Sequence, residues 1–397
     1  LPGYPVFTRK PSTDVSYIAC AKKMLGDRSA FYSQFATHNA HTVAAIKEIA
    51  GNDLDFEFQR LHGMGEALFE HVVPQKAMGV ACRVYAPVGG HEDLLAYLVR
   101  RLLENGANTS FVNRIVDEKA PIAEIVADPI AKTRETDPKP QDGIPGPRDV
   151  FRPERPSAMG VDITDELVIG PMAERMAASS CGRWTAGPIV GGVEGKTDPR
   201  PIVDPSDHHR VVGHAADASL EDVDAAMGRA VRAFDGWDRT PADSRATCLE
   251  KTADLLEETM AEALAICVRE AGKSIPDAIA EVREAVDFCR YYAARARADF
   301  GAPTPLPGPT GEDNSIRLQG RGVFACISPW NFPLAIFLGQ VTAALAAGNT
   351  VLAKPAEQTP LIAAYAVRLL HKAGVPADVV QLLPGPGESV GAALVSD

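Results

Sequence analysis

The chain has 397 residues, of which 46% are hydrophobic and 23% charged, and it carries a formal net charge of −12. This length predicts two or three domains, and the composition is that of a soluble globular protein rather than a disordered or fibrous one. The acidic balance argues against a nucleic-acid-binding surface spread across the chain as a whole.

The first 117 residues repeat a short apolar run followed by a stretch with helical periodicity, four times in all. The apolar runs cover residues 5–8, 33–38, 56–61 and 80–87, and the helical stretches cover residues 13–25, 41–49, 66–72 and 91–103. A repeat of roughly 25 residues is typical of βα units in a parallel sheet. Four such units predict half of a (β/α)8 barrel, whose active site lies where the strands end.

The last of these helices carries two adjacent arginines. Tyr97, Arg100, Arg101 and Glu104 follow helical spacing and therefore share one face. Neighbouring arginines at a barrel rim can hold a carboxylate with several charge-assisted hydrogen bonds. The alternative is a solvated face with an Arg100–Glu104 pair worth about 0.2–0.5 kcal/mol. His38 is similarly open to two interpretations, a functional group at a strand end or a cap on the following helix.

The middle of the chain has a different character. Residues 132–148 are rich in proline, glycine and charge and have no apolar period, which predicts a linker. We therefore expect three parts: a barrel segment over residues 1–130, a linker over residues 131–181, and a second domain over residues 182–397.

The second domain begins with helical patterns over residues 219–235, 245–259 and 278–296. From Gly322 onward, strands and helices alternate: the strands cover residues 323–327, 350–354 and 379–383, and helices begin at Pro333 and Pro360. This alternation predicts a Rossmann-like sheet. The apolar run at residues 334–348 is short and interrupted by polar residues, so we predict a buried helix rather than a membrane span.

Small or polar residues follow each of these three strands, where a dinucleotide binds in such folds. Lys354 and Glu357 end the second strand, and a carboxylate there accepts from ribose hydroxyls and repels a 2′-phosphate, which favours NAD over NADP. Gly385, Gly387 and Gly391 form a glycine-rich turn, for which an ordinary turn is the alternative. Trp330 lies either at this site or in the core.

The seven cysteines have no CxxC or metal-ligand spacing, so we expect no metal site, and a reducing compartment. Cys326 is a candidate nucleophile, but its place within a predicted strand favours a buried structural thiol.

Four segments of the first part carry a family resemblance: Phe-Ala-Thr-His-Asn at residues 35–39, and residues 58–66, 84–89 and 94–111. They resemble the bacterial proline dehydrogenase barrel and, more narrowly, the proline utilization A family, in which that barrel is fused to an aldehyde dehydrogenase. The resemblance implies that Arg100 and Arg101 bind the proline carboxylate while Tyr85 and Leu61 close over the ring. It implies FAD contacts from Thr8, Lys10, Thr37, His38, Asn39, Gln59, Glu104 and Ser110. The flavin would take a hydride from the carbon next to the ring nitrogen.

From about residue 182 onward, the strand-end segments, residues 225–237 with Arg245, and residues 281–293 are similar to the aldehyde dehydrogenase superfamily. The resemblance is to 1-pyrroline-5-carboxylate (glutamate semialdehyde) dehydrogenases. It implies NAD contacts from Ile327, Ser328, Pro329, Trp330, Lys354, Glu357, Gly387 and Val390. Asn331 would donate its side-chain amide to the oxyanion of a thiohemiacetal. The cysteine nucleophile and glutamate base that such enzymes need are not among these 397 residues.

We therefore expect an internal fragment of a bifunctional enzyme, inactive by itself, whose parent oxidises L-proline with FAD and glutamate semialdehyde with NAD. The resemblance further implies a membrane quinone as electron acceptor, a homo-oligomer, and a cytoplasmic enzyme that is peripheral to the inner membrane when reduced. DNA is expected as a partner only if a DNA-binding segment precedes the chain. The alternatives are a monofunctional aldehyde dehydrogenase joined to an unrelated barrel, and a truncated, non-catalytic binding module.

Overall fold

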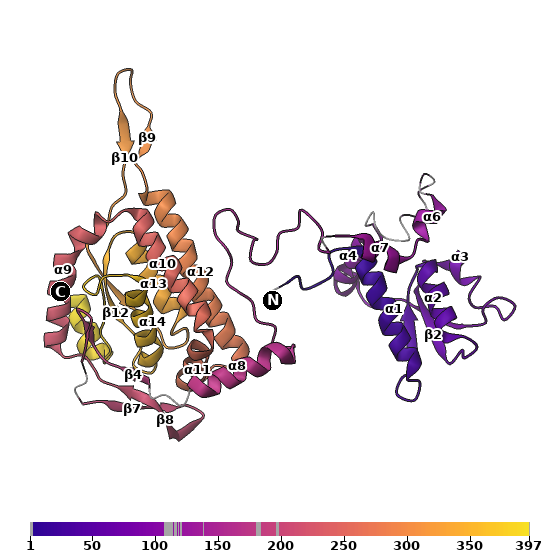
Figure 1. Ribbon diagram of the computed structural model, residues 1–397, viewed down its shortest axis with the longest axis horizontal. Helices are drawn as coiled ribbons and strands as arrows, with labels where there is room; N and C mark the ends of the chain where they lie inside the picture. The colour runs from indigo at the N-terminus through magenta and orange to yellow at the C-terminus, as the bar shows by residue number, and fades with distance from the viewer. Residues whose placement is uncertain are drawn as a thin grey trace. The chain divides into compact units, whose positions relative to one another are not determined.

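The chain folds into two compact units, residues 4–144 and residues 145–397 with residues 1–3. The computed structural model describes residues 3–106, 114, 117, 119, 121–137, 139–179, 184–195 and 198–396, without the side chains of residues 102 and 104–106. The units are called the N-terminal unit and the C-terminal unit here, and each is built around its own sheet (Figure 1).

The N-terminal unit contains three strands in the order β1-β2-β3, all parallel, and each is followed by a helix. Its elements are α1 (Lys10–Gly26), β1 (Ser33–Ala36), α2 (Ala40–Ala50), β2 (Phe56–Leu61), α3 (Glu66–Phe69), β3 (Ala81–Tyr85), α4 (His91–Gly106), α6 (Ile122–Ile125) and α7 (Pro129–Glu135). The predicted βα alternation is thus confirmed for three of the four units.

Alternation along β2 separates an apolar face of this sheet from a polar one. Phe56 and Phe58 are buried, with their ring centroids 5.4 Å apart, and they pack with Phe35 of β1 and with helix α2. Because successive strand residues point to opposite faces, Glu57 and Gln59 lie on the other side of the sheet. In a βα fold this other side is the one that lines the barrel interior.

The strand predicted at residues 5–8 does not form. The Tyr4 hydroxyl donates to the Ile144 carbonyl at 2.7 Å, and the Gln141 amide donates to Thr8 Oγ1 at 2.9 Å. A strand needs a neighbour for its ladder, and Pro5 has no N–H to contribute. The polar groups of this segment are satisfied instead by residues 140–144.

The C-terminal unit has a five-stranded sheet in the order β11-β12-β13-β5-β6, with the first three strands parallel. Its helices are α8 (Glu166–Ser179), α9 (Leu220–Asp238), α10 (Ala242–Glu258), α11 (Met260–Ala271), α12 (Ile275–Phe300), α13 (Ala335–Ala346), α14 (Pro360–Ala373), η1 (Gly387–Gly391) and α15 (Ala392–Ser396). Its strands are β4 (Trp184–Ala186), β5 (Ile189–Val190), β6 (Val193–Glu194), β7 (Arg200–Asp204), β8 (Asp207–Ala215), β9 (Thr304–Leu306), β10 (Asn314–Ile316), β11 (Val323–Ile327), β12 (Thr350–Lys354) and β13 (Val380–Leu382).

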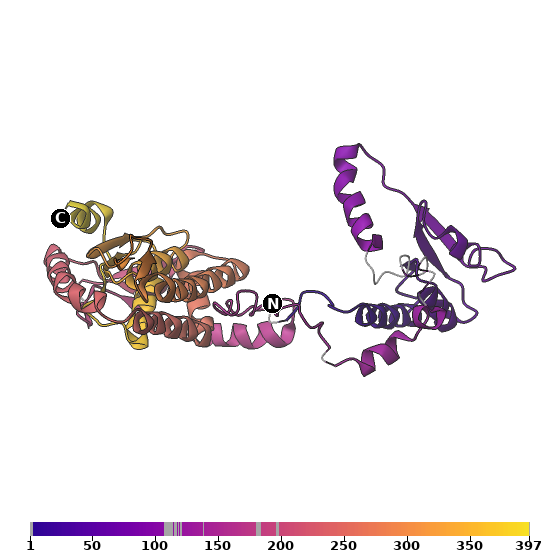
Figure 2. The same cartoon turned by 90° about the horizontal axis from the view of Figure 1, so that it is seen from above.

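Helices cover both faces of this sheet (Figures 1 and 2). Val351 and Ala353 of β12 pack into the larger core with helices α10 to α14, whereas Leu352 packs with α9 and α15. A strand buried on both faces reads as a continuous apolar run, which is why β12 is recognisable from sequence. The apolar run at residues 334–348 forms the buried helix α13, as predicted. In the described part of the chain, no helix is long and apolar enough to cross a membrane.

Two antiparallel hairpins were not predicted. Strands β7 and β8 pair with each other, and β4 joins β8 in a separate three-stranded sheet. Strands β9 and β10 form a second hairpin, which projects from the unit in Figure 1.

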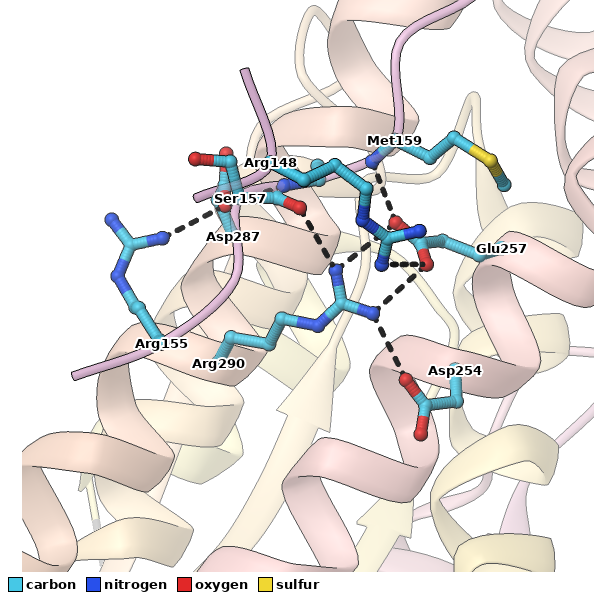
Figure 3. A network of polar contacts seen from close by, with 9 residues as sticks. Arg148, Arg155, Ser157, Met159, Asp254, Glu257, Asp287 and Arg290 are labelled. Atoms are coloured by element: carbon cyan, nitrogen blue, oxygen red, sulfur yellow. Dashed lines mark hydrogen bonds and ion pairs between the residues drawn. The ribbon is translucent and has the colours of Figure 1, made fainter. Parts of the chain in front are cut away.

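A buried ionic cluster joins α10 to α12. Arg290 of α12 is 4% exposed, and its Nη2 donates to Glu257 and to Asp254, both of α10, at 2.9 Å (Figure 3). Arg290 Nη1 donates a second bond to Glu257 at 3.0 Å. The guanidinium holds the pKa of Glu257 below its usual range even though burial acts in the opposite direction.

The same cluster ties down part of the predicted linker. Glu257 accepts from Arg148 Nη2 at 3.3 Å and from the Met159 amide at 2.6 Å, and Asp287 accepts from Arg155 Nη1 at 2.9 Å (Figure 3). Residues 148–159 are therefore fixed to the C-terminal unit by polar contacts, although their composition is that of a linker. The same predicted linker also contains helix α8.

Candidate functional site

The predicted cofactor residues of the C-terminal unit gather at the carboxyl edge of its sheet. Strands β11 and β12 are in register, with Ile327 opposite Lys354. The Ser328 amide extends the ladder by donating to the Lys354 carbonyl at 3.1 Å. Because both strands end at the same level, the segments that follow them lie side by side at this edge.

The segment after β11 offers polar groups that face away from the core. Pro329 and Asn331 are exposed, and Trp330 is 57% exposed, so core packing of Trp330 is wrong in the described structure. The Ser328 hydroxyl is buried and has no hydrogen-bond partner among the described residues. An unpaired buried hydroxyl beside exposed ring and amide groups is suited to a polar ligand.

Lys354 ends β12 as a buried amine. Its Nζ donates to the Pro355 carbonyl at 3.3 Å. Burial lowers the pKa of Lys354, and the nearby carboxylates of Glu357, Asp217 and Glu388 act in the opposite direction. The ammonium therefore lies in an acidic surrounding, close to the edge where a ligand would bind.

Glu357 links the end of β12 to the glycine-rich turn. Its Oε1 accepts from the Gly387 amide at 2.8 Å, and the turn itself is the π-helical η1, which contains buried Val390. Gly385 has φ +147°, and a Cβ there would lie 2.6 Å from Val390 Cγ2, so only glycine fits. Glu357 also lines a cavity of about 300 Å³. The glycines thus hold a carboxylate at a defined place beside open space.

Cys326 is buried in β11 within the main core, and burial raises the pKa of its thiol to about 12. The predicted structural role is confirmed, because a neutral, enclosed thiol is a poor nucleophile.

Two buried glutamates cap the helices that follow β11 and β12, and sequence reasoning missed both. Glu281 of α12 accepts from the Leu334 and Ala335 amides at 2.9 and 2.8 Å, at the start of α13. Glu270 of α11 accepts from the Leu361 and Ile362 amides at 2.6 and 3.0 Å, at the start of α14. The carboxylates satisfy amides that have no partner within their own helices.

Glu270→Gln is expected to flatten the pH dependence of stability. Burial raises the pKa of Glu270 to about 8, outweighing the two backbone hydrogen bonds that lower it. In the unfolded chain this carboxyl ionises near pH ~4.3. Between these values the folded state holds a proton that the unfolded state has released. The free energy of unfolding therefore falls as pH rises, by up to about 1.4 kcal/mol per pH unit.

Urea unfolding at about pH 5.5 and about pH 7.5 measures this effect. Tryptophan fluorescence reports on the C-terminal unit, since all three tryptophans lie in it. The glutamine variant should lose stability less steeply with pH than the parent chain, and equal slopes would contradict the assignment.

In the N-terminal unit, four of the eight predicted flavin residues, Thr37, His38, Asn39 and Gln59, lie at or near the ends of β1 and β2. The Leu61 amide donates to His38 Nε2 at 3.2 Å, and Asn39 Oδ1 accepts from the His41 amide at 3.0 Å. Asn39 is therefore the cap of α2, and a capping role for His38 is wrong. Thr37 Oγ1 accepts from the Asn39 amide at 3.1 Å. Leu61 of β2 is the strand partner of Tyr85 of β3.

The polar face of the sheet holds a charged pair that the motifs did not indicate. Glu57 is buried and accepts from Arg83 Nε at 2.7 Å and Nη2 at 2.9 Å, with further bonds from Gln34 and Gln59. The bond from Arg83 is the main reason that the pKa of Glu57 is lowered. A charged residue between two buried phenylalanines is the signal from which an interior-facing carboxylate was predictable.

A cavity of about 230 Å³ adjoins these strand ends. Lys10, Asn39, Arg114 and Lys132 are among its lining residues, and Lys10 also pairs with Asp14. Three cations and one carboxylate, that of Asp14, line this cavity, so its net charge favours an anionic ligand. Thr8 is engaged by the Gln141 amide instead.

Helix α4 stands apart from the sheet in Figure 2, and its Leu95, Leu98 and Leu103 side chains are exposed. Arg100 is exposed, and the Arg101 guanidinium lies 5.3 Å from the Tyr97 ring centroid. The Glu104 side chain and Ser110 lie outside the described residues, and with them the alternative Arg100–Glu104 pair.

Two family models match separate parts of the chain. The model described as Aldehyde dehydrogenase family matches residues 193–397, and the model described as Proline dehydrogenase matches residues 1–114. The order of the two parts agrees with the resemblance predicted from the motifs.

Known proteins match over the full chain. The Bifunctional protein PutA of Klebsiella aerogenes is 50% identical over 100% of this chain and 30% of its own length. A solved variant of Bradyrhizobium japonicum Proline Utilization A (PutA) is 48% identical, with a TM-score of 0.77 over 100% of this chain and 37% of that one. A 1-pyrroline-5-carboxylate dehydrogenase from Thermus, solved with bound NAD, is 35% identical, with a TM-score of 0.58 over 60% of this chain and 47% of that one. The chain thus spans about 30% of the length of the curated bifunctional relative.

Proposed function

The chain belongs to the aldehyde dehydrogenase family over residues 193–397, and from this premise we propose that it is a segment of a bifunctional enzyme of proline catabolism. In this proposal the whole protein oxidises L-proline to 1-pyrroline-5-carboxylate with FAD. Hydrolysis gives glutamate semialdehyde, which the protein oxidises to L-glutamate with NAD. Residues 1–130 contribute to the first site, residues 131–181 connect the two, and residues 182–397 contribute the cofactor-binding part of the second.

The main support for NAD-dependent aldehyde oxidation is the alignment of the ends of strands β11, β12 and β13 around Glu357. Its carboxylate is fixed by the Gly387 amide at the edge of the parallel sheet, beside a cavity. This placement suits an adenosine ribose with free hydroxyls and disfavours a 2′-phosphate, which supports NAD over NADP. NAD supplies the hydride acceptor when it is bound. The Thermus relative, solved with NAD, supports the same assignment.

Asn331 is the chain's own contribution to the chemistry of aldehyde oxidation. Its amide is exposed in the turn after β11, beside the buried Ser328 hydroxyl. A fixed amide donor stabilises negative charge that develops on an aldehyde oxygen attacked by a nucleophile. The nucleophile and the base are supplied by other parts of the whole protein.

The residues present also fit a flavin in the N-terminal unit. The cavity lined by Lys10, Arg114 and Lys132 suits a pyrophosphate, and Asn39 reaches the same cavity from the end of β1. FAD supplies the hydride acceptor for proline. Arg100 and Arg101 are proposed to hold the proline carboxylate, and Leu61 and Tyr85 to close over the ring.

Further parts of the proposal concern partners and location. The flavin electrons pass to a membrane quinone, the whole protein is a cytoplasmic homo-oligomer that reaches the membrane surface when reduced, and DNA is a partner only if a DNA-binding segment precedes the chain. The relative named Bifunctional protein PutA supports the pairing of the two activities.

The test is an assay of the whole gene product with its natural flanking segments. L-Proline should bleach the bound flavin, and addition of a soluble quinone and NAD should then produce NADH. NADH from glutamate semialdehyde without flavin reduction by proline would leave a monofunctional aldehyde dehydrogenase. Neither reaction would leave a binding module.

A further inference from the structure

We propose that Glu281, acting together with Lys273, is a positioning residue that holds the turn carrying Asn331 in place for aldehyde oxidation. The inference deepens the proposed aldehyde dehydrogenase function and rests on it. Neither residue reaches the reacting atoms, so their effect is transmitted through the turn at residues 328–334.

Residues 328–332 of this turn are neither helix nor strand, and the contacts that hold the turn lie toward its ends, including the bond from the Ile336 amide to the Phe332 carbonyl at 3.3 Å. At its start, the Ser328 amide donates to Lys354 of the neighbouring strand at 3.1 Å. At its end, Glu281 Oε1 accepts from the Leu334 and Ala335 amides. Asn331 lies between the two anchors, with its side chain exposed. The second anchor is three residues from Asn331, so displacing it moves the amide donor.

Lys273 contacts the middle of the turn and is the counter-ion of Glu281. Its Nζ lies 2.7 Å from Glu281 Oε2, an ion pair without hydrogen-bond alignment, and 4.6 Å from the Phe332 ring centroid. The Glu281 side chain is fully buried, whereas that of Lys273 is 13% exposed. One ammonium therefore contacts both the buried carboxylate and the ring next to Asn331.

Glu270 provides a comparison, because it caps a different helix, α14. It caps α14 in the same way, from the other side of the α11–α12 corner, and has no contact with residues 328–334 among the described residues. The two glutamates share burial and helix-capping geometry and differ in that Glu281 pairs with Lys273, so Glu270 is a control for helix capping itself. A purely structural account predicts the same result for both, and the positioning account does not.

Glu281→Gln in the whole gene product is expected to lower kcat for glutamate semialdehyde by about 10- to 100-fold, since small misplacements of a catalytic group cost this much. The glutamine keeps one acceptor but turns an uncharged amide toward Lys273. The KM for NAD should change less than kcat, because Glu357 is unaffected and Ser328, at the other end of the turn, keeps its bond to Lys354. Glu270→Gln, assayed at saturating NAD, should retain the parent kcat.

A double-mutant cycle with Asn331→Ala identifies the route of the effect. If Glu281 acts by placing Asn331, Glu281→Gln should lower kcat no further once the amide is gone. An equal fold-loss in both backgrounds would overturn the proposal. Lys273→Met is the second variant should Glu281→Gln fail to fold, and Lys273→Arg should restore part of kcat. An inactive parent enzyme would instead refute the proposed function itself.

Discussion

Arg290→Met is expected to lower the free energy of unfolding of the C-terminal unit by about 3 kcal/mol, the largest effect on stability that we predict for a single substitution. The guanidinium is the common partner of Glu257 and Asp254, and Glu257 is itself only 8% exposed. Removing the cation leaves a buried carboxylate short of its main counter-charge. The expected loss is at the low end of the ~3–5 kcal/mol typical of broken buried pairs, because Glu257 keeps Arg148 and the Met159 amide.

Urea unfolding of the chain, followed by tryptophan fluorescence, measures this loss. Arg295→Met is the matched control, because Arg295 lies on the same helix and pairs with Asp299 at the surface. An exposed pair of this spacing contributes only about 0.3–0.5 kcal/mol. Similar losses for the two variants would mean that the buried cluster does not stabilise the unit beyond ordinary helix packing.

The strands that the sequence predicted well are short apolar runs with polar or glycine residues at their ends, whether buried on both faces like β12 or largely exposed like β11. The bounds of β2, β11 and β12 agree with the predicted ranges because an apolar run between polar or glycine residues marks a strand of a parallel sheet. The missed elements lack that signal. Strand β8 includes His208, His209 and Arg210 and is largely exposed over its first half. Helix α11 is buried over five successive residues, Ala263 to Cys267, so its apolar surface is wider than the single stripe that marks a surface helix.

Site residues were predictable where they follow strands and not where they join distant segments. The ends of parallel strands share one edge, so Lys354 and Glu357 were assigned from their position alone. Glu281 caps a helix that begins 54 residues later, and no local pattern indicates that contact. The roles of Arg100 and Arg101 follow from the family resemblance, since spacing alone favoured a solvated helix face.

The double substitution Arg100→Met and Arg101→Met is expected to reduce kcat/KM for proline in the whole gene product by about 10²- to 10⁴-fold. Hydrogen bonds to a charged group contribute about 1.5–3 kcal/mol each, and every 1.4 kcal/mol is about tenfold. Methionine keeps the length and helix propensity of arginine, so α4 should persist. Oxidation of glutamate semialdehyde with NAD should be unchanged, because the second site draws on the other unit.

Stopped-flow bleaching of the bound flavin by proline separates the contributions of the two arginines to binding from any loss of cofactor. The flavin content of the variant must equal that of the parent for the comparison to hold. Arg28→Met is the control within the same unit, since Arg28 pairs with Asp53 at the amino end of β2, opposite to the carboxyl ends, and it should leave flavin reduction unchanged. If the double variant still reduces its flavin at the parent rate and proline dependence, the carboxylate is bound elsewhere. A selective loss would instead mean that the face of α4 carrying Arg100 and Arg101 is the carboxylate site, and not a solvated surface.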